Sequence, residues 1–398
     1  MRGSIRKRGR TWTYVLDLGQ DTGGRRRQKW VGGFATKRQA ESALTEVLER
    51  VRTGGYRDAG RTTVAEYLEQ WLTGHAPAVR LTTAKSYANT LRHHVIPRIG
   101  HLRLTALEPR HVSTLIADLL ATGRMLGEGG LSPRSVQYAH KILSHALSDA
   151  VKWGLLSRNP AALVDSPRVP RKEMQVWTPE QVRAFLGLVN GDRLFAMWVL
   201  FVSTGMRRGE VLGLRWADID FDRGRLAVRQ NLVEVEYELV MSEPKTAKSR
   251  RVVSLDPYTV NVLAGHRQAQ LTECRALGVV SDERWAQLVF TQPDGRPCQP
   301  QNVSQAFENI VRRSGLPQIR LHDLRHTAAT VALNVGIHPK VVSERLGHAN
   351  IGITLDTYSH VVQGLQDAAA VELGRAIFKE EPASSVVVPL SSHGGSTG

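Results

Sequence analysis

A proline-containing stretch near the middle of the chain most strongly limits what this sequence can fold into. Residues 159–172 contain three prolines and three cations: Pro160, Pro167, Pro170, Arg168, Arg171 and Lys172. Because proline fixes its own backbone and keeps the preceding residue extended, the stretch predicts an extended, positively charged linker. A chain of 398 residues is also too long for one compact core. We therefore expect two or three domains, with one boundary at this linker.

Composition excludes several classes of protein. Hydrophobic residues make up 41% of the chain and charged residues 23%, ordinary globular values that exclude a largely disordered chain. No apolar run approaches the ~20 residues that span a bilayer, and no apolar signal core follows the first residues. The two cysteines, Cys274 and Cys298, are too few for a disulfide framework or a cysteine-rich metal site. We expect a cytoplasmic protein with no membrane contact and no bound metal.

Positive charge is concentrated in the first 170 residues. The chain has 53 Lys and Arg against 37 Asp and Glu, a net charge of +16, and 42 of the cations are arginine. The net charge is +8 over residues 1–60, +6 over 61–170 and +2 over 171–398. A G- and C-rich genome would favour arginine codons, but codon bias alone does not place net charge at one end. Because arginine binds phosphate oxygens through its planar fork, we expect double-stranded DNA as the partner, held mainly by the N-terminal part.

Residues 1–58 predict a small strand-rich unit closed by one helix. Alternating and basic segments over 10–34, with a turn at 21–24, are typical of a small sheet. Thr36 and Gln39 form a capping box that predicts the helix. Four cations are expected to contact DNA, close to two tryptophans: Arg25, Arg26, Arg27 and Lys29, with Trp12 and Trp30. An ordinary basic surface is the alternative.

Residues 61–165 predict a helical bundle. Thr63 and Glu66 form a capping box before an amphipathic segment. Three more helical patterns follow: 83–95, 109–121 and 134–152. Because no strand pattern interrupts them, we expect a four-helix bundle with basic faces.

Residues 173–380 predict a mixed α/β domain, and residues 381–398 a mobile tail rich in Ser, Gly and Val. Thr178 caps a first helix, and a buried helix is expected over 193–203. Two strand-like segments, 225–235 and 250–255, flank a polar turn with Lys245 and Lys248. Helical patterns resume from about 258.

Three short patterns in this domain carry reactive side chains. Arg207 follows the buried helix, so its guanidinium can point inward. His322 and Arg325 lie three residues apart, which places both on one face of a helix. His348 follows a glycine, and Tyr358 comes ten residues later. Each pattern alone is explained as well by ordinary capping or packing.

Taken in order, these patterns resemble the catalytic domain of the tyrosine recombinases, the phage integrase family. The match spans about 170–365 and includes Thr-Gly-Met-Arg-Arg-Gly-Glu, His-Asp-Leu-Arg-His-Thr and Leu-Gly-His. The two upstream units resemble the family's arm-binding and core-binding domains. The resemblance implies a multidomain, mainly α fold with small β-sheets, belonging to a site-specific integrase of a bacterial mobile element. It also implies a nucleoid-associated homotetramer on paired attachment sites, and the family commonly uses an excision factor and a DNA-bending protein.

The same resemblance implies the catalytic roles, and the residue types suit them. Tyr358 forms a 3′-phosphotyrosine bond, and neither a metal nor another cofactor is required. Arg207 and Arg325 can neutralise the charge that develops on the phosphate oxygens. Either His322 or His348 can donate a hydrogen bond and move protons. Lys245 is a plausible acid for the leaving 5′ oxygen.

Some assignments have local competitors. Lys248 competes with Lys245, and Arg208 with Arg207; the family pattern favours Lys245 and Arg207. Glu210 matches the acidic position of the family motif and is expected to orient Arg207.

His326 and His360 are expected to pack or cap helices, because each lies beside a stronger candidate. Two competing functions are a type IB topoisomerase, which shares this chemistry, and a DNA-binding regulator that never cuts. The three-part architecture, with its small basic N-terminal unit, favours the integrase over the topoisomerase. Tyr358→Phe would separate the integrase from the regulator, because a regulator should lose nothing.

Overall fold

The chain separates into two units, Met1–Arg171 and Lys172–Gly398. The computed structural model describes residues 3–20, 26–52, 61–170, 174–235, 238–243, 250–278, 284–358 and 366–378. Several of the residues singled out above lie outside the described residues: Arg25, Lys245, Lys248, His360 and the tail over 381–398. Within the described ranges, none of the helices combines the length and the apolar composition that crossing a bilayer would need.

The first unit begins with a three-stranded antiparallel sheet of order β1-β2-β3 and one helix. Its elements are β1 (Gly3–Arg8), β2 (Thr11–Gln20), β3 (Arg26–Phe34) and α1 (Lys37–Arg52). The sheet and the helix were predicted, whereas β1 was not. Tyr14 and Leu16 of β2 pack against Leu44 of α1, and the capping box between Thr36 and Gln39 is formed.

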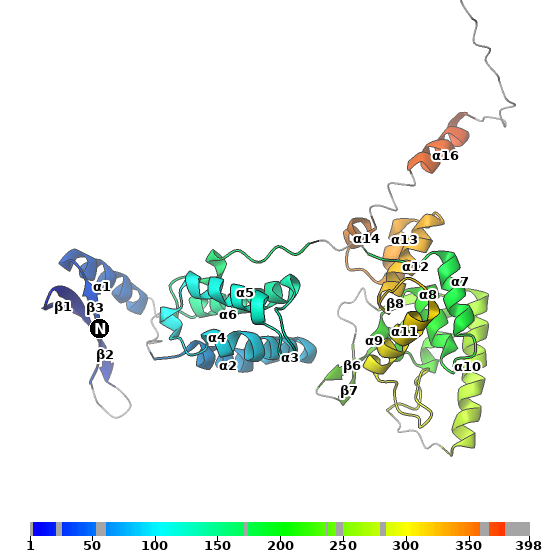
Figure 1. Ribbon diagram of the computed structural model, residues 1–398, viewed down its shortest axis with the longest axis horizontal. Helices are drawn as coiled ribbons and strands as arrows, with labels where there is room; N and C mark the ends of the chain where they lie inside the picture. Colours follow the sequence, from blue (N-terminus) through cyan, green and yellow to red (C-terminus); the bar gives the residue numbers. More distant parts are fainter. Residues whose placement is uncertain are drawn as a thin grey trace, which may run out of the picture. The chain divides into compact units, whose positions relative to one another are not determined.

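A helical bundle follows in the same unit (Figure 1). Its elements are α2 (Val64–His75), η1 (Ala76–Ala78), α3 (Leu81–Thr90), η2 (Leu91–Val95), α4 (Ile96–Ile99), η3 (Leu104–Ala106), α5 (Pro109–Thr122), α6 (Pro133–Lys152) and η4 (Ala161–Leu163). The expected helix over 83–95 is longer and widens into a π-helical turn at η2. Pro97 explains the widening, because proline has no N–H to donate and its ring crowds the carbonyl of His93. Trp71 and Leu143 lie in the shared core.

The second unit is mixed α/β, as predicted. Its helices are α7 (Pro179–Leu188), α8 (Phe195–Thr204), α9 (Arg208–Leu212), η5 (Trp216–Asp218), α10 (Pro257–Ala276), α11 (Pro300–Ser314), α12 (Asp323–Asn334), α13 (Pro339–Leu346), α14 (Ile351–Thr357) and α16 (Gln366–Phe378). Its strands are β4 (Ile219–Asp220), β5 (Arg225–Val228), β6 (Asn231–Val235), β7 (Glu238–Ser242) and β8 (Arg251–Ser254). Trp198 and Trp216 are buried in its core, as expected.

The single strand expected over 225–235 is divided between two sheets. β5 pairs with β4 and β8, whereas β6 pairs with β7 in a separate hairpin. Gln230 lies between β5 and β6, and its side-chain amide donates to the carbonyl of Gly213 over 2.8 Å. This hydrogen bond fixes the chain where the two strands separate. Gly213 ends α9, and a Cβ there would lie 2.8 Å from the backbone nitrogen of Leu232 in β6. Glycine is therefore needed where the end of α9 approaches β6.

Glycine also brings two functional segments together. Gly205, which ends α8, has a φ of +64°, a conformation that favours glycine. A Cβ there would lie 2.7 Å from Cδ2 of Leu346, the last residue of α13. The end of α8 therefore reaches the end of α13, and the segments that follow them, with Arg207 and His348, start from neighbouring points.

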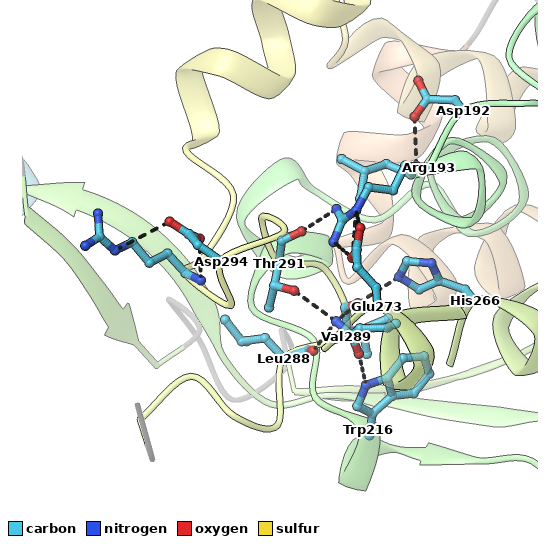
Figure 2. Close-up of polar contacts among 12 residues, drawn as sticks. Asp192, Arg193, Trp216, His266, Glu273, Leu288, Val289, Thr291 and Asp294 are labelled. Atoms are coloured by element: carbon cyan, nitrogen blue, oxygen red, sulfur yellow. Dashed lines mark hydrogen bonds and ion pairs between the residues drawn. The ribbon is translucent and has the colours of Figure 1, made fainter. Parts of the chain in front are cut away.

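Helix α10 holds the loop before α11 through side-chain contacts (Figure 2). Gln270 accepts a hydrogen bond from the indole of Trp216 over 2.8 Å and donates to the carbonyl of Val289 over 3.1 Å. Arg193, just before α8, donates to the carboxylate of Glu273 over 2.8 and 2.9 Å through Nε. These contacts join the start of α8, helix α10 and the loop before α11.

Candidate active site

Arg325 belongs to a polar cluster in the second unit, and its charge acts on, or is acted on by, the other members. These are Arg207, Glu210, Arg251, His322, His348 and Tyr358. It stands in the first turn of α12, and only 4% of its surface is exposed. Its two terminal nitrogens donate to the carbonyls of Gly205 and Leu346, each over 2.8 Å. Burial and then the charge of Arg207 lower its pKa to about 9. The guanidinium is still protonated at neutral pH, and it binds the ends of α8 and α13.

Arg207 is joined to a second arginine through one buried carboxylate. Nη1 of Arg207 donates to Oε1 of Glu210 over 2.8 Å. From β8, Arg251 donates to the two oxygens of that carboxylate over 3.1 and 2.8 Å, and through Nε to the carbonyl of Arg345 over 2.6 Å. Burial acts to raise the pKa of Glu210, but the hydrogen bonds and charges of Arg251 and Arg207 hold it below its usual value. The carboxylate therefore stays charged and orients both arginines, while the Arg207 side chain remains 40% exposed.

Two histidines near this cluster are held in their neutral form. Burial, followed by the charges of Arg325 and Arg207, lowers the pKa of His348 to about 4. Loss of hydration, followed by the charges of His326 and Arg325, lowers the pKa of His322 to about 4, although part of that residue stays open to solvent. Nδ1 of His348 shares a 2.7 Å hydrogen bond with Thr354 Oγ1, which fixes the ring.

Tyr358 occupies an apolar pocket directly after α14. Its side chain is fully buried and packs against Leu333 and Leu346. Its hydroxyl shares a 2.8 Å hydrogen bond with Nδ1 of His326. Burial raises the pKa of Tyr358 to about 12, although the charge of Arg325 acts against this. The phenol is therefore protonated at neutral pH and closed to solvent.

The structure brings together five of the six residues that the sequence singled out as catalytic candidates. Arg207 and Arg325 both lower the pKa of His322 and His348, so these four share one electrostatic field. Tyr358 lies close enough to Arg325 for that charge to act on its pKa. The sixth, the lysine of the polar turn, is outside the described residues.

Sequence reasoning missed the roles of His326 and Arg251. His326 was expected to pack, yet it contacts the Tyr358 hydroxyl. Its position four residues after His322 was the available signal, because i and i+4 share a helix face. Arg251 gave no local signal, since it is one more cation in a basic strand. Its hydrogen bonds to Glu210 and Arg345 reach distant parts of the chain. Arg208, the competitor of Arg207, instead donates to the backbone and side chain of α11.

The N-terminal unit carries cations on β1 beside two tryptophans, in addition to the cations expected in β3. Arg26, Arg27 and Lys29 lie on β3, as the sequence predicted. The overlooked strand β1 adds Arg6 and Arg8, whose guanidinium carbons lie 5.3 and 4.7 Å from the ring centre of Trp30. Trp30 is 40% exposed. An exposed indole with two stacked guanidinium groups is suited to phosphate and base contacts.

Comparison with known proteins agrees with this geometry. The model of the phage integrase family matches residues 175–364. The ICEBs1 integrase of Bacillus subtilis is 31% identical over 250 residues, which cover 62% of this chain and 67% of that protein. The chain belongs to the phage integrase family of tyrosine recombinases. It is therefore a DNA strand-transferring enzyme, a site-specific integrase.

The upstream units match family models as well. An arm DNA-binding domain matches residues 4–51, and the N-terminal SAM-like domain of phage integrases matches residues 63–120. A XerC-like tyrosine recombinase of Caldanaerobacter subterraneus is 27% identical over 385 residues, 92% of this chain and 95% of its own. The integrase thus resembles this relative over nearly its whole length.

Solved structures show the same fold. The Tn1549 transposon integrase in complex with a circular intermediate DNA gives a TM-score of 0.65 at 21% identity, covering 79% of this chain and 99% of that chain. A lambda integrase tetramer bound to a Holliday junction gives a TM-score of 0.55 at 17% identity, covering 89% of this chain and 94% of that chain.

Proposed function

We propose that this integrase recombines two double-stranded attachment sites as a homotetramer. The chemistry in this proposal is carried by the six residues that the sequence singled out, together with His326, which contacts the phenol: Arg207, Lys245, His322, Arg325, His348 and Tyr358. The observation that supports it most is the proximity of Arg207 to Arg325, whose pKa its charge helps to lower. Two cations held together against their repulsion favour an anion between them, and a scissile phosphate is such an anion.

In the cleavage step, the phenolic oxygen of Tyr358 attacks phosphorus and the bond from phosphorus to the 5′ oxygen breaks. The phenolic proton goes to a histidine, and the leaving oxygen takes a proton from Lys245. Among the described residues, His326 is the histidine in hydrogen-bond contact with the phenol, so we assign it as the first proton acceptor. The 3′-phosphotyrosine conserves the phosphodiester bond energy, and a 5′-hydroxyl of the partner strand reverses the step.

Attack requires a change from the conformation described above. The Tyr358 side chain has no exposed surface and its pKa is raised to about 12. DNA binding must therefore open the pocket and bring the phenol to the phosphate, where positive charge lowers the cost of ionising it. The short helix α14, which carries Tyr358 at its end, is the element that has to move in this proposal.

The tetramer follows from the number of strands. Exchange between two duplexes breaks four strands, and each chain offers one Tyr358. The lambda integrase relative was solved as a tetramer on a Holliday junction, which supports the same assembly here. Residues 1–58, with Arg25, Arg26, Arg27 and Lys29, would bind arm sites, and the bundle over 61–165 would bind the core site. An excision factor and a DNA-bending protein would set direction.

Covalent capture tests the proposal. Full-length integrase is incubated with fragmented DNA of its mobile element and host, denatured in detergent, and the trapped DNA is sequenced. Tyr358→Phe should abolish capture while retaining DNA binding, because the phenolic oxygen is the nucleophile. Tyr258→Phe is the matched control, since Tyr258 is 56% exposed on α10; it should capture DNA like the wild type. Undiminished capture by Tyr358→Phe would contradict the assignment.

A further inference from the structure

A cluster of two imidazoles and a carboxylate lies in the helical bundle, apart from the catalytic unit. His75 is the last residue of α2, and His145 and Asp149 lie one turn apart on α6. One nitrogen or oxygen atom of each lies within 4.8 Å of those of the other two. The rings of His75 and His145 are nearly perpendicular, with centres 5.0 Å apart. Three side chains from two helices therefore converge on one point.

The contacts within the described residues leave this cluster incompletely satisfied. Nε2 of His75 is buried and has no hydrogen-bond partner there. Nε2 of His145 is 3.8 Å from Oδ2 of Asp149, too long for a hydrogen bond. A buried polar atom without a partner calls for an explanation, and an ion is one of the ordinary ones. The three ligand atoms lie within 4.8 Å of one another, so the side chains would need to close only to the shorter spacing of ligands around one ion to complete a site.

We propose that His75, His145 and Asp149 bind one transition-metal dication of the Zn²⁺ type. Neutral imidazole nitrogens and a carboxylate oxygen are ligands that zinc takes at about 2.0–2.2 Å, with a water completing four-coordination. The indole of Trp71 donates to Oδ2 of Asp149 over 2.9 Å. That hydrogen bond holds the carboxylate in place, as partners behind metal ligands commonly do. The ion would join the end of α2 to α6 and stabilise the bundle; it has no part in strand transfer.

One neighbour opposes binding and provides a sharp test. Nζ of Lys152 lies 3.0 Å from Oδ1 of Asp149, and its side chain is 70% exposed. Its positive charge competes with a dication for the same carboxylate, and an exposed side chain can swing away at little cost. Lys152→Gln should therefore tighten metal binding several-fold, while substitution of either imidazole should weaken it.

The experiment uses the full-length integrase freed of metal by a chelator and titrated with Zn²⁺, with Co²⁺ as the spectroscopic probe. We expect one Zn²⁺ per chain and a rise in the midpoint of thermal unfolding. His145→Gln should lower the affinity by more than about 100-fold, because loss of even a partner behind the ligands costs 10- to 100-fold. His145 is exposed, so this variant should fold even if His75→Gln does not. His101→Gln, at an exposed histidine of the same unit, is the control and should bind Zn²⁺ like the wild type.

Two outcomes would overturn the proposal. One is equal Zn²⁺ affinity in the wild type and in His145→Gln, which would place the binding at other histidines. The other is a midpoint of thermal unfolding that changes with pH but not with added Zn²⁺. His145 and Asp149 would then form no more than an ion pair.

Discussion

Replacing Arg251 tests whether one buried side chain positions several catalytic segments. Arg251 makes two hydrogen bonds to Glu210, whose side chain is 1% exposed, and one to the backbone of Arg345, three residues before His348. Removing one partner of a buried ion pair costs about 3–5 kcal/mol, because the other charge stays buried. In a unit of this size each 1 kcal/mol lowers the thermal midpoint by about 2–4 °C, so Arg251→Gln should lower it by roughly 6–20 °C.

The pH dependence of this loss follows from Glu210. In the wild type the pKa of Glu210 lies below 4.5, so its charged form stabilises the fold above that pH and the contribution is lost on acidification. Without Arg251, burial favours the protonated carboxyl. The difference in stability between the wild type and Arg251→Gln should therefore be largest near pH 7 and shrink as the pH falls through the lowered pKa of Glu210.

The effect on cleavage is measured in single turnovers on nicked DNA at saturating concentration. A carboxylate that loses Arg251 orients Arg207 less well. If Arg207 donates to the scissile phosphate as proposed, misplacing it should cost about 100- to 1,000-fold in rate. DNA affinity should change little. Arg250→Gln is the control, because the neighbouring Arg250 is 58% exposed and pairs with the exposed Glu243. A folded Arg251→Gln that cleaves DNA as fast as the control would refute the positioning argument.

Three further outcomes are expected. Gly347→Ala should lose about 1–3 kcal/mol in chemical denaturation, because residue 347 has a φ of +68° and the new Cβ would lie 3.0 Å from the Arg251 guanidinium. The wild type should lose thermal stability as the pH falls from 6.5 towards 4. In this range His348 is protonated in the unfolded chain but stays neutral in the folded protein, so acid favours unfolding. His348→Gln should reduce this loss. Deletion of residues 1–58 should abolish recombination in a two-site plasmid assay and spare binding to the core site in a gel-shift assay at a fixed salt concentration.

The sequence predicted those parts of the fold that local signals specify. Capping boxes at Thr36, Thr63 and Thr178 mark helix starts that the structure confirms. Strand β1 was missed because Gly3–Arg8 has three consecutive cations and Ile5 as its one apolar side chain, so it shows no alternating pattern and its place depends on pairing with β2. Strands β5 and β6 were merged because the break between them depends on the approach of Gly213, which no local pattern encodes.

In the candidate site, too, residues within local motifs could be predicted, whereas contacts between distant parts of the chain could not. Arg207, His322 and Arg325 were identified from short motifs, because spacing on a helix and the order of motifs are visible in one dimension. The contact between His326 and Tyr358 spans 32 residues, and that between Arg251 and Glu210 spans 41. Contacts of this kind depend on how α12, β8 and α9 pack. The spacing of residues along one element can place a side chain on a face, but it does not predict the distant residue that this side chain contacts.

Burial and, after it, gathered positive charge lower the pKa values of Arg325 and His348, and a bound DNA phosphate would act against the second cause. Arg325 has a pKa of about 9, and His348 one of about 4, partly because the cluster gathers positive charge in a place with little water. A phosphate placed among these groups supplies the missing negative charge and favours the protonated forms of Arg325 and His348. The free protein therefore stores electrostatic repulsion that substrate binding relieves. The positive cluster stabilises a bound species more when that species carries more negative charge. It should therefore stabilise the pentavalent transition state more than the bound phosphodiester.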